Sequence, residues 1–515
     1  MSRKWLPTGD ITSALAGGVL SSANGSVSAP SKSENFAFQT HYSFRGKYSF
    51  DFTARFDKSN GNPKKWGAYY GISGRWNISD ETFIKEKLKW INMLSLSLGW
   101  GRSGRPSGGS TSMYSTYSSD GSYLGVTAVA PQQIRLKIIR PANNDTWNLG
   151  SHFAFFRNKI SGDVQVYTSR NEQVQSYPIP TSSGYSNLPA KLQGIVRNNG
   201  WEFNLNINNF IRRGKFSASF NMAFSNNRNQ ILEMDAMVLD QMNNEFNHEN
   251  GQYLSRVQIK NPIGSIYGFR YKGVYAYSEW SATEIPGVSG PDAPVARNAA
   301  GEVILNENGR SKPMMFDYGG IQYEFKGGDA KYEDINHDGN INELDIVYLG
   351  SSLPKLTGGF GIQLNYGRFN VNMRFNYRIG QKVVNGARMT AENMYENNNQ
   401  SRAVNWRWHN EGDIAVIPRA LHDFGYNWLG SDRFMEDASF LRMNFITMSY
   451  SVPTKQLTQF GIKSLSLNLN FNNVFVLTKY SGADPEVSQG GYSAARDNGR
   501  TPRSKQFTLG INIGF

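Results

Sequence analysis

The segment Asp334–Asp345 has the residue types and the spacing of a calcium-binding loop. It carries acidic or amide side chains at positions one, three and five, a glycine at position six and an acid at position twelve. Calcium takes oxygen ligands in proteins, and Gly339 at position six allows the sharp turn that brings those oxygens together. The candidate ligands are Asp334, Asn336, Asp338, the main-chain carbonyl of Asn340, Asn342 through a water molecule, and Asp345.

The twelfth position of this loop holds Asp345, where calcium loops of this type usually hold a glutamate. Dockerin modules share this aspartate variant. The alternative is a surface turn that binds no metal, because Asn and Asp side chains also stabilise turns through their own backbone. We expect a structural calcium ion that holds a long loop in place, with Asp329 and Glu333 adding negative charge nearby.

No other arrangement of residues in the sequence indicates catalysis. The six His residues show neither an HExxH motif nor another paired metal-ligand spacing, and nucleophile and phosphate-loop motifs are absent. The chain has no Cys, which excludes disulfides and thiolate sites. Its net charge of +13 comes from Lys and Arg spread along the sequence, so nucleic acid is not expected as a partner. We predict that the protein is not an enzyme.

Tryptophans gather in the long segment 381–438, where Trp406 and Trp408 lie among polar residues and Trp428 follows. Aromatic faces beside polar groups can stack on sugars or on a partner protein. The same rings can instead pack the loop against itself, since aromatic side chains bury large apolar areas. The sequence leaves both interpretations open.

The elements that must hold these residues are β-strands, and the clearest of them ends the chain. Apolar and polar side chains alternate in the last nine residues, so one face of this strand is apolar and the other is small or polar. A change of face near Phe445 in an earlier strand indicates a β-bulge. The apolar row of the last strand comprises Phe507, Leu509, Ile511, Ile513 and Phe515.

The same alternation recurs along the chain and predicts about thirteen strands of roughly 9–12 residues, long enough to span a bilayer when tilted. A soluble two-sheet sandwich has the same period. However, short turns such as 45–47 and 366–369 alternate with long segments, which is typical of outer-membrane barrels. Trp147 and Trp201, near predicted strand ends, suit the aromatic girdles of such barrels.

Two parts are expected: a lead-in segment or loop, 1–33, and barrel strands from 34 to 515 that include a large outer loop, 228–354. Residues 105–122, rich in Ser and Gly, are predicted to form a flexible loop, and 173–199 another long connection. Met1–Asp10 lacks the apolar core of a secretory signal. A barrel needs export, so we expect either a removed signal or a longer parent chain.

Several stretches, taken in order, resemble the C-terminal half of SusC/RagA-type TonB-dependent transporters of Bacteroidota. The most extensive are YEDINHDG at 332–339, DRFMEDASFLRM at 432–443 and TKYSGADPE at 478–486. The resemblance spans nearly all of 34–515. Shorter matching stretches are Gly46–Tyr48, Trp66–Gly67, Gly350–Pro354, Gly358–Phe360, Ser449–Pro453 and Asn472–Phe475.

This resemblance implies an all-β fold: the C-terminal part of an antiparallel transmembrane β-barrel of about 22 strands with long extracellular loops. It implies a location in the outer membrane of a Gram-negative bacterium, in contact with outer-membrane lipid. The implied partners are a SusD-like surface lipoprotein, an N-terminal plug and barrel segment of the same transporter, and TonB, which binds through that missing segment.

The expected function is therefore that of the barrel part of a TonB-energised importer of oligosaccharides or peptides. The sequence does not distinguish between these two substrate classes. One alternative is a surface binding or adhesion barrel that imports nothing. Another is a soluble, β-rich extracellular protein with a calcium-binding turn.

Overall fold

The structure is a computed structural model of the chain. Its strands and loops form two compact units. The first comprises residues up to Asn208 together with Asn227–Val238, and the second comprises Asn209–Asn226 and Leu239–Phe515. The described residues are 2–4, 19–22, 33–59, 66–105, 116–123, 126–133, 142–178, 182, 187–243, 253, 256–278, 293–318, 320–453, 457, 459, 461–488 and 490–515.

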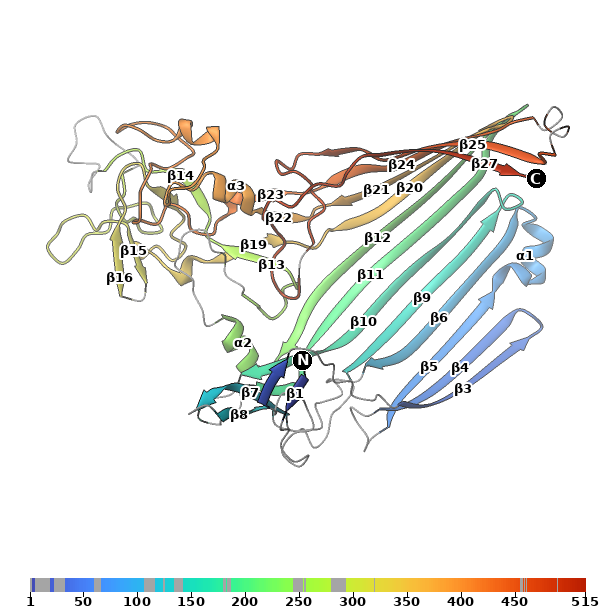
Figure 1. The fold of residues 1–515 in the computed structure, drawn as a ribbon, viewed down its shortest axis with the longest axis horizontal. Helices are drawn as coiled ribbons and strands as arrows, with labels where there is room; N and C mark the ends of the chain where they lie inside the picture. The colour runs from blue at the N-terminus through green and yellow to red at the C-terminus, as the bar shows by residue number, and fades with distance from the viewer. Residues whose placement is uncertain are drawn as a thin grey trace. The chain divides into compact units, whose positions relative to one another are not determined.

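Long antiparallel strands build the first unit, and each pairs with the next along the sheet (Figure 1). A short segment, η2 (Ile78–Asp80) and α1 (Thr82–Lys87), connects two of them. The strands, in their order across the sheet, are β3 (Ser33–Phe44), β4 (Tyr48–Ser59), β5 (Gly67–Asn77), β6 (Ile91–Arg105), β9 (Ala142–Phe155), β10 (Ile160–Pro178) and β11 (Asn187–Arg213).

The second unit contains a similar antiparallel series, which ends at the C-terminus. Seven strands of the first unit and six of the second make thirteen among the described residues, so the predicted all-β antiparallel fold and strand number are confirmed. The six, in order across the sheet, are β12 (Phe216–Met234), β20 (Leu356–Tyr366), β21 (Phe369–Ile379), β24 (Phe440–Ser451), β25 (Ser464–Thr478) and β27 (Gln506–Gly514).

Tight turns join neighbouring strands where the sequence predicts them. Arg45 and Gly46 have φ of +52° and +68°, and Lys47 N–H donates to the Phe44 carbonyl at 3.0 Å. Two successive residues with positive φ match the twist of a hairpin, and glycine adopts this conformation without steric cost. Gly367, with φ of +59°, lies in the turn between β20 and β21.

Each long strand has one apolar and one polar face. On β27, Leu509 is 63% exposed and Ile511 is 58% exposed, whereas in a soluble sandwich such rows pack against a second sheet. The apolar rows of β3, β4 and β6 are exposed in the same way, as at Phe38, Phe50 and Leu98. A dry sandwich interior is therefore not what these residues form, and the apolar faces are available to lipid.

The predicted bulge in β24 is confirmed. The register of β24 against both β21 and β25 shifts between Met443 and Phe445. The shift lets Met443 and Ile446 face the same side, although they are three positions apart and would face opposite sides in a regular strand.

Two strands continue beyond the predicted boundaries. The connection expected at 173–199 is largely strand, because β10 continues to Pro178 and β11 begins at Asn187. Polar side chains there obscured the pattern, but backbone pairing needs no apolar face. Trp201 therefore lies inside β11 and not near its end. Trp147 lies inside β9, level with Trp100.

The prediction of a flexible loop at 105–122 is wrong for the part that is described. β7 (Thr116–Tyr123) pairs with β8 (Val126–Gln133) as a hairpin, and 106–115 lie outside the described residues. Within the expected lead-in 1–33, β1 (Ser2–Lys4) pairs with β2 (Val19–Ser22), and most of the rest lies outside the described residues.

The expected outer loop 228–354 contributes the end of β12 to the long strands, and its other described strands form separate small sheets. Between β12 and these strands lies α2 (Ala236–Asn243). None of the helices in the described part of the chain is long and apolar enough to cross a membrane. The short strands of this segment are β13 (Ser265–Gly268), β14 (Tyr271–Val274), β15 (Met315–Tyr318), β16 (Ile321–Glu324), β17 (Ala330–Tyr332), β18 (Asn340–Ile341) and β19 (Val347–Ser351).

If the apolar face contacts lipid, a charge will be tolerated on only one side of β27. We expect Leu509→Arg to destabilise the folded protein by about 2–4 kcal/mol, the cost of Arg on the lipid face near the bilayer midplane. Thr508→Arg, one residue earlier on the opposite face, is the matched control and will cost little. Urea unfolding in lipid bilayers measures both variants. Equal losses of stability would contradict the assignment of faces.

Candidate functional site

The polar faces of the strands in the first unit carry hydrogen-bonded side chains that can also interact with a polar solute. Asp51 on β4 contacts the His41 ring at 2.7 Å and accepts from Ser73 at 3.4 Å. Further along the sheet, Asn204 donates to Asp163 at 3.0 Å. These groups have remaining donors and acceptors, since each carboxylate oxygen and amide can form more than one hydrogen bond.

A shallow hollow of about 260 Å³ lies on this polar face. Glycines at Gly71, Gly99 and Gly101 contribute no side chains to it, and Ser73 and Asn148 add small polar groups. A Cβ at Gly101 would meet nothing closer than 4.0 Å, so the space above this residue is open.

The second unit has a corresponding polar face. Arg374 on β21 donates to Asn221 on β12 at 3.0 Å, and Thr447 on β24 donates to Asn470 on β25 at 2.8 Å. The face thus presents amides, hydroxyls and a guanidinium. These groups exchange hydrogen bonds equally well with sugar hydroxyls and with peptide groups.

The long connections of the second unit form a packed body, here called the loop assembly. It consists of the described residues in 253–355, 380–439 and 479–503. Its largest core is aromatic, and Phe316 stacks on Tyr426 with ring centroids 3.9 Å apart. Further elements of the assembly are β22 (Lys382–Asn385), α3 (Gly386–Ala391), η5 (Arg402–Trp406), η6 (Asp432–Phe434), β23 (Met435–Asp437) and β26 (Arg496–Asp497).

A buried ion pair joins two parts of the loop assembly. Asp329 is fully buried and accepts from Arg419 Nε at 2.7 Å and from the Tyr323 hydroxyl at 2.7 Å. Glu333 is paired with Arg270 and Lys272. The expectation that Asp329 and Glu333 add negative charge near the calcium-type loop is therefore wrong, because both carboxylates are neutralised.

The calcium-type loop lies in the same assembly, and its two ends are drawn together. Asp345 accepts from the Ile335 amide at 2.7 Å and from the Asn342 amide at 2.9 Å, so the twelfth position reaches back to the second. Asp334 accepts from the amides of Asp338 and Gly339 at 3.3 and 2.7 Å. Gly339 has φ of +82°, which suits glycine, and an added Cβ would meet Ala296 Cβ at 2.5 Å.

The remaining candidate ligands occupy the turn between these ends. Asp338 accepts from the Asn340 amide at 2.7 Å and from the Asn336 side chain at 2.9 Å, while Asn342 caps the short helix η4 (Glu343–Asp345). In the described part of the chain, no three His, Asp or Glu side chains are grouped closely enough to hold a metal ion.

The donor set of this loop fits a hard cation such as calcium, since every candidate ligand is an oxygen. Asp345 is fully buried, and burial raises its pKa to about 6, aided by the charges of Asp334 and Asp338 and opposed by the amides of Asn342 and Ile335. Burial likewise raises the pKa of Asp334. Burial, the first cause of both shifts, disfavours the ionised carboxylates, and the ammonium of Lys312, which donates to the Asp338 carbonyl, is the positive charge beside the loop.

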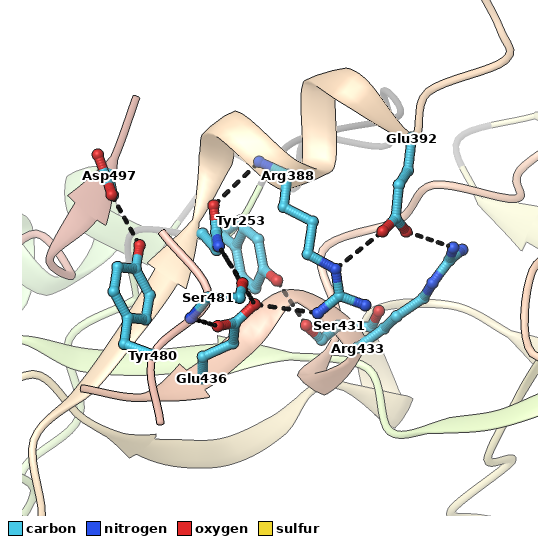
Figure 2. Close-up of polar contacts among 10 residues, drawn as sticks. Tyr253, Arg388, Glu392, Ser431, Arg433, Glu436, Tyr480, Ser481 and Asp497 are labelled. Carbon is cyan, nitrogen blue, oxygen red and sulfur yellow. Dashed lines mark hydrogen bonds and ion pairs between the residues drawn. The ribbon is translucent and has the colours of Figure 1, made fainter. Parts of the chain in front are cut away.

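A network of polar contacts joins two of the stretches that carry the resemblance noted from sequence to the segment of α3 (Figure 2). Arg388 on α3 bridges Glu392 at 2.9 Å and Glu436 at 3.0 Å. Glu436 also accepts from Ser481, through its amide at 2.9 Å and its hydroxyl at 2.8 Å. The network joins three parts of the chain that are far apart in sequence.

Arg433 is the most enclosed charge in this network. Its side chain is only 3% exposed, its Nη2 donates to Glu392 at 2.8 Å, and the rings of Trp428 and Phe434 lie 4.4 and 4.8 Å from the guanidinium carbon. Arg433 Nε and Nη1 have no hydrogen-bond partner among the described residues. Glu392 is therefore the contact that offsets the burial of this charge.

A second group of charges joins the loop assembly to the start of β24. Arg442 has a side chain that is 5% exposed, and it contacts Asp484 at 2.5 Å and Glu486 at 3.6 Å. Glu486 also pairs with Arg378 at 3.5 Å and with Arg503 at 3.0 Å. The segment after β25 is thus held over the strands by ion pairs.

Arg433, Glu436, Arg442, Asp484 and Glu486 belong to stretches that carry the resemblance, whereas Arg388 and Glu392 lie outside them, and no contact was predicted for any of these residues. The signal that could have suggested an ionic network is the density of charged residues in 432–443 and 484–486. The distant partners could not be paired from sequence, since Arg433 and Glu392, for example, are 41 residues apart.

The tryptophans of segment 381–438 were expected either to stack on a sugar or partner or to pack the loop, and the structure shows examples of both environments. Trp428 is buried at 2% exposure and belongs to a core with Phe434, so it packs the loop assembly. Trp408 is partly buried and packs close to Gly328. Trp406 is 74% exposed and remains available to a sugar or a partner.

Long antiparallel strands with both faces accessible, joined by tight turns at one end and by a packed loop assembly at the other, define a β-barrel class of protein. The sequence is related to TonB-dependent receptors, and the resemblance to SusC/RagA-type receptors is thereby confirmed. TonB-dependent receptor P39 of Formosa agariphila is 28% identical over 492 residues, covering 92% of this chain and 45% of that receptor. TonB-dependent receptor SusC of Bacteroides thetaiotaomicron is 24% identical, covering 92% and 43%.

The fold agrees with this relationship. The structure of the RagAB peptide transporter matches with a TM-score of 0.72 at 18% identity, over 98% of this chain and 50% of that one. No known family profile matches the chain. The chain spans about half the length of the curated relatives it matches. These relatives are named as receptors, in line with the expectation that the protein is not an enzyme.

Breaking the contact of Arg433 should loosen the loop assembly. We expect Glu392→Ala to destabilise it by about 3–5 kcal/mol, because a buried guanidinium loses its carboxylate. Hydrogen exchange of segment 380–439 in the purified protein measures this loss as faster exchange. Glu324→Ala is the control, since Glu324 forms an exposed pair with Lys326 and its loss should cost at most about 1 kcal/mol. Unchanged exchange in Glu392→Ala would contradict the assignment.

Proposed function

We propose that this chain forms part of the barrel of an active importer in the outer membrane of a Gram-negative bacterium. The importer takes up oligosaccharides or peptides, is energised by TonB and works with a SusD-like surface lipoprotein. The observation that carries this proposal is the pair of faces on the long strands. The exposed apolar rows suit lipid, and the opposite faces suit a polar solute in a watery passage.

The two outermost strands support the participation of further strands. Among the described residues, β3 pairs only with β4 and β27 only with β25. Unpaired backbone groups are very costly in lipid, so both edges need partners there. We propose that an N-terminal segment of the transporter supplies those strands, the plug and the site for TonB. The extra length of the relatives supports this proposal.

The substrate class stays open between peptides and oligosaccharides. A structural relative is described as a peptide importer, which supports peptides, whereas the names of the relatives SusC and P39 include no substrate. Hydroxyl, amide and guanidinium groups on the polar faces suit both classes.

Uptake by cells tests the proposal against a barrel that only binds. Cells carrying the complete protein should accumulate labelled oligosaccharides or peptides, and loss of TonB or of the proton gradient should stop accumulation while surface binding remains. A neighbouring SusD-like lipoprotein should co-purify with the protein in detergent. Binding without energy-dependent accumulation would instead support the surface binding or adhesion barrel.

Two glycines on opposite faces of adjacent strands test which face the substrate passes. We expect Gly101→Trp, on the polar face, to lower the initial rate of uptake by narrowing the hollow. Gly74→Trp is the matched control: it lies on the apolar face, nothing approaches its Cβ position within 4 Å, and Trp is tolerated beside lipid. Slower uptake in Gly74→Trp alone would reverse the assignment of faces.

We also propose that the loop Asp334–Asp345 binds a calcium ion with a structural role, held by Asp334, Asn336, Asp338, Asn340, Asn342 and Asp345. The all-oxygen donor set and the way Asp345 draws the two ends of the loop together support this proposal. The ion would supply positive charge, while the carboxylates and amides hold the loop around Gly339.

The pH dependence of this loop follows from the raised pKa of Asp345. Without calcium, the protonated form is favoured in the folded loop, so stability is greatest below the ordinary aspartate pKa and falls as pH rises towards about 6. Calcium requires the ionised form, so its affinity should fall as pH is lowered from 7.5 to 5. Calorimetric titration with calcium at pH 7.5 and at pH 5 measures the two affinities. Asp345→Asn should bind calcium weakly at either pH, and equal affinity in that variant would refute the site.

A further inference from the structure

An open apolar groove of about 1150 Å³ crosses the strands of the second unit. Its walls come from β12, β20, β21, β24 and β25. The strand registers place these side chains on one face, because Phe360 is paired with Met222 and Phe375, and Tyr377 with Leu441. The apolar lining residues on this face are Phe220, Met222, Phe224, Leu356, Phe360, Tyr377, Ile379, Leu441 and Leu477.

The groove lies at the end of the strands that leads into the loop assembly. Leu356 begins β20, Ile379 ends β21 and Leu477 is next to the end of β25. The short turn between β20 and β21 lies at the other end of those strands. In a barrel with short turns on the inner side, the groove would lie on the lipid face at the level of the outer leaflet.

The rim of the groove is polar and carries a net positive charge. Asp437 pairs with Lys382 at 3.3 Å and with the Ser439 hydroxyl, which also accepts from the Gly380 amide at 2.9 Å. Lys479 is exposed at the same rim. Because Lys382 neutralises Asp437, the positive charge at this rim is that of Lys479.

We propose that this groove binds an anionic lipid, with acyl chain along the apolar wall and a headgroup phosphate at Lys479. The proposal rests on the proposed function in one respect, namely that the apolar face of these strands lies in the membrane. It assigns a specific lipid site to one part of that face.

The lining favours a lipid over a peptide segment. The Tyr377 hydroxyl is already satisfied by the Ala223 carbonyl at 3.0 Å, so the wall offers few hydrogen bonds. A peptide laid along it would leave backbone N–H and C=O groups unpaired, which is costly, whereas an acyl chain has no such groups. The charged rim then complements a phosphate, and a primary ammonium is a common phosphate ligand.

Lipid titration of the complete protein tests this site. The protein is purified in detergent, stripped of lipid and titrated with dioleoyl phosphatidylglycerol, while native mass spectrometry counts bound lipids. We expect one tightly retained lipid and an affinity lowered about tenfold in Lys479→Glu, the effect of losing one charged hydrogen bond. Lys463→Glu, an exposed lysine at the opposite end of β25, is the matched control and should bind as the unaltered protein does.

Two further titrations show which part of the lipid the groove recognises. Dioleoylglycerol, which lacks the phosphate, should bind at least as weakly as phosphatidylglycerol binds to Lys479→Glu. Inorganic phosphate should not displace the lipid. Displacement would show that the site binds free anions and not specifically a lipid. Leu477→Trp, which adds bulk to an exposed wall position, should weaken retention without touching the rim.

The proposal is overturned if Lys479→Glu retains the lipid as well as Lys463→Glu does, or if dioleoylglycerol binds as tightly as phosphatidylglycerol. Resistance of the native band to unfolding in detergent confirms that each variant is folded. If the folded protein imports its substrate but retains no lipid, the lipid site in the groove is refuted and the proposed import function is not. A protein that never inserts into membranes refutes the proposed function as well.

Discussion

The period of two in a β-strand is the constraint on which this structure depends. Successive side chains point to opposite faces, while the backbone pairs with its neighbours regardless of sequence. A chain that places Phe, Leu and Ile on alternate positions therefore produces a continuous apolar sheet face without a second sheet to cover it. The exposure of Leu509 and Phe38 shows that nothing in the described part of the chain covers that face. Such a surface needs an apolar environment, and a bilayer supplies one.

The same constraint explains why β24 contains a bulge. Without the shift between Met443 and Phe445, Arg442 would point to the same face as Ile446 and Met448. The extra residue turns Arg442 to the other side, where Asp484 and Glu486 neutralise it. One irregular position thus separates a buried ion pair from an apolar row, and it connects the strand to the loop assembly.

Sequence reasoning succeeded where one local rule determines the structure. Alternation gave the thirteen strands, positive-φ residues such as Gly46 gave the tight turns, and the change of face gave the bulge. It failed where backbone pairing alone determines that a segment is a strand, as in β7 and in the extensions of β10 and β11. Polar residues there form strands whose sequence has no alternating apolar pattern. It also could not place Trp428 in a core and Trp406 at the surface, since burial depends on contacts with distant segments.

The residues that carry the family resemblance have a structural explanation, and this limits what the resemblance can say about substrate. Arg433, Glu436, Arg442 and Asp484 are engaged with one another or with neighbours inside the chain, so their charges are already compensated. Side chains in that state hold loops in place, and they cannot also select a solute. In an importer of the kind proposed, selection has to come from groups with free faces, of which the exposed ring of Trp406 and the polar strand faces are examples. Two chains can therefore share these motifs and transport different molecules.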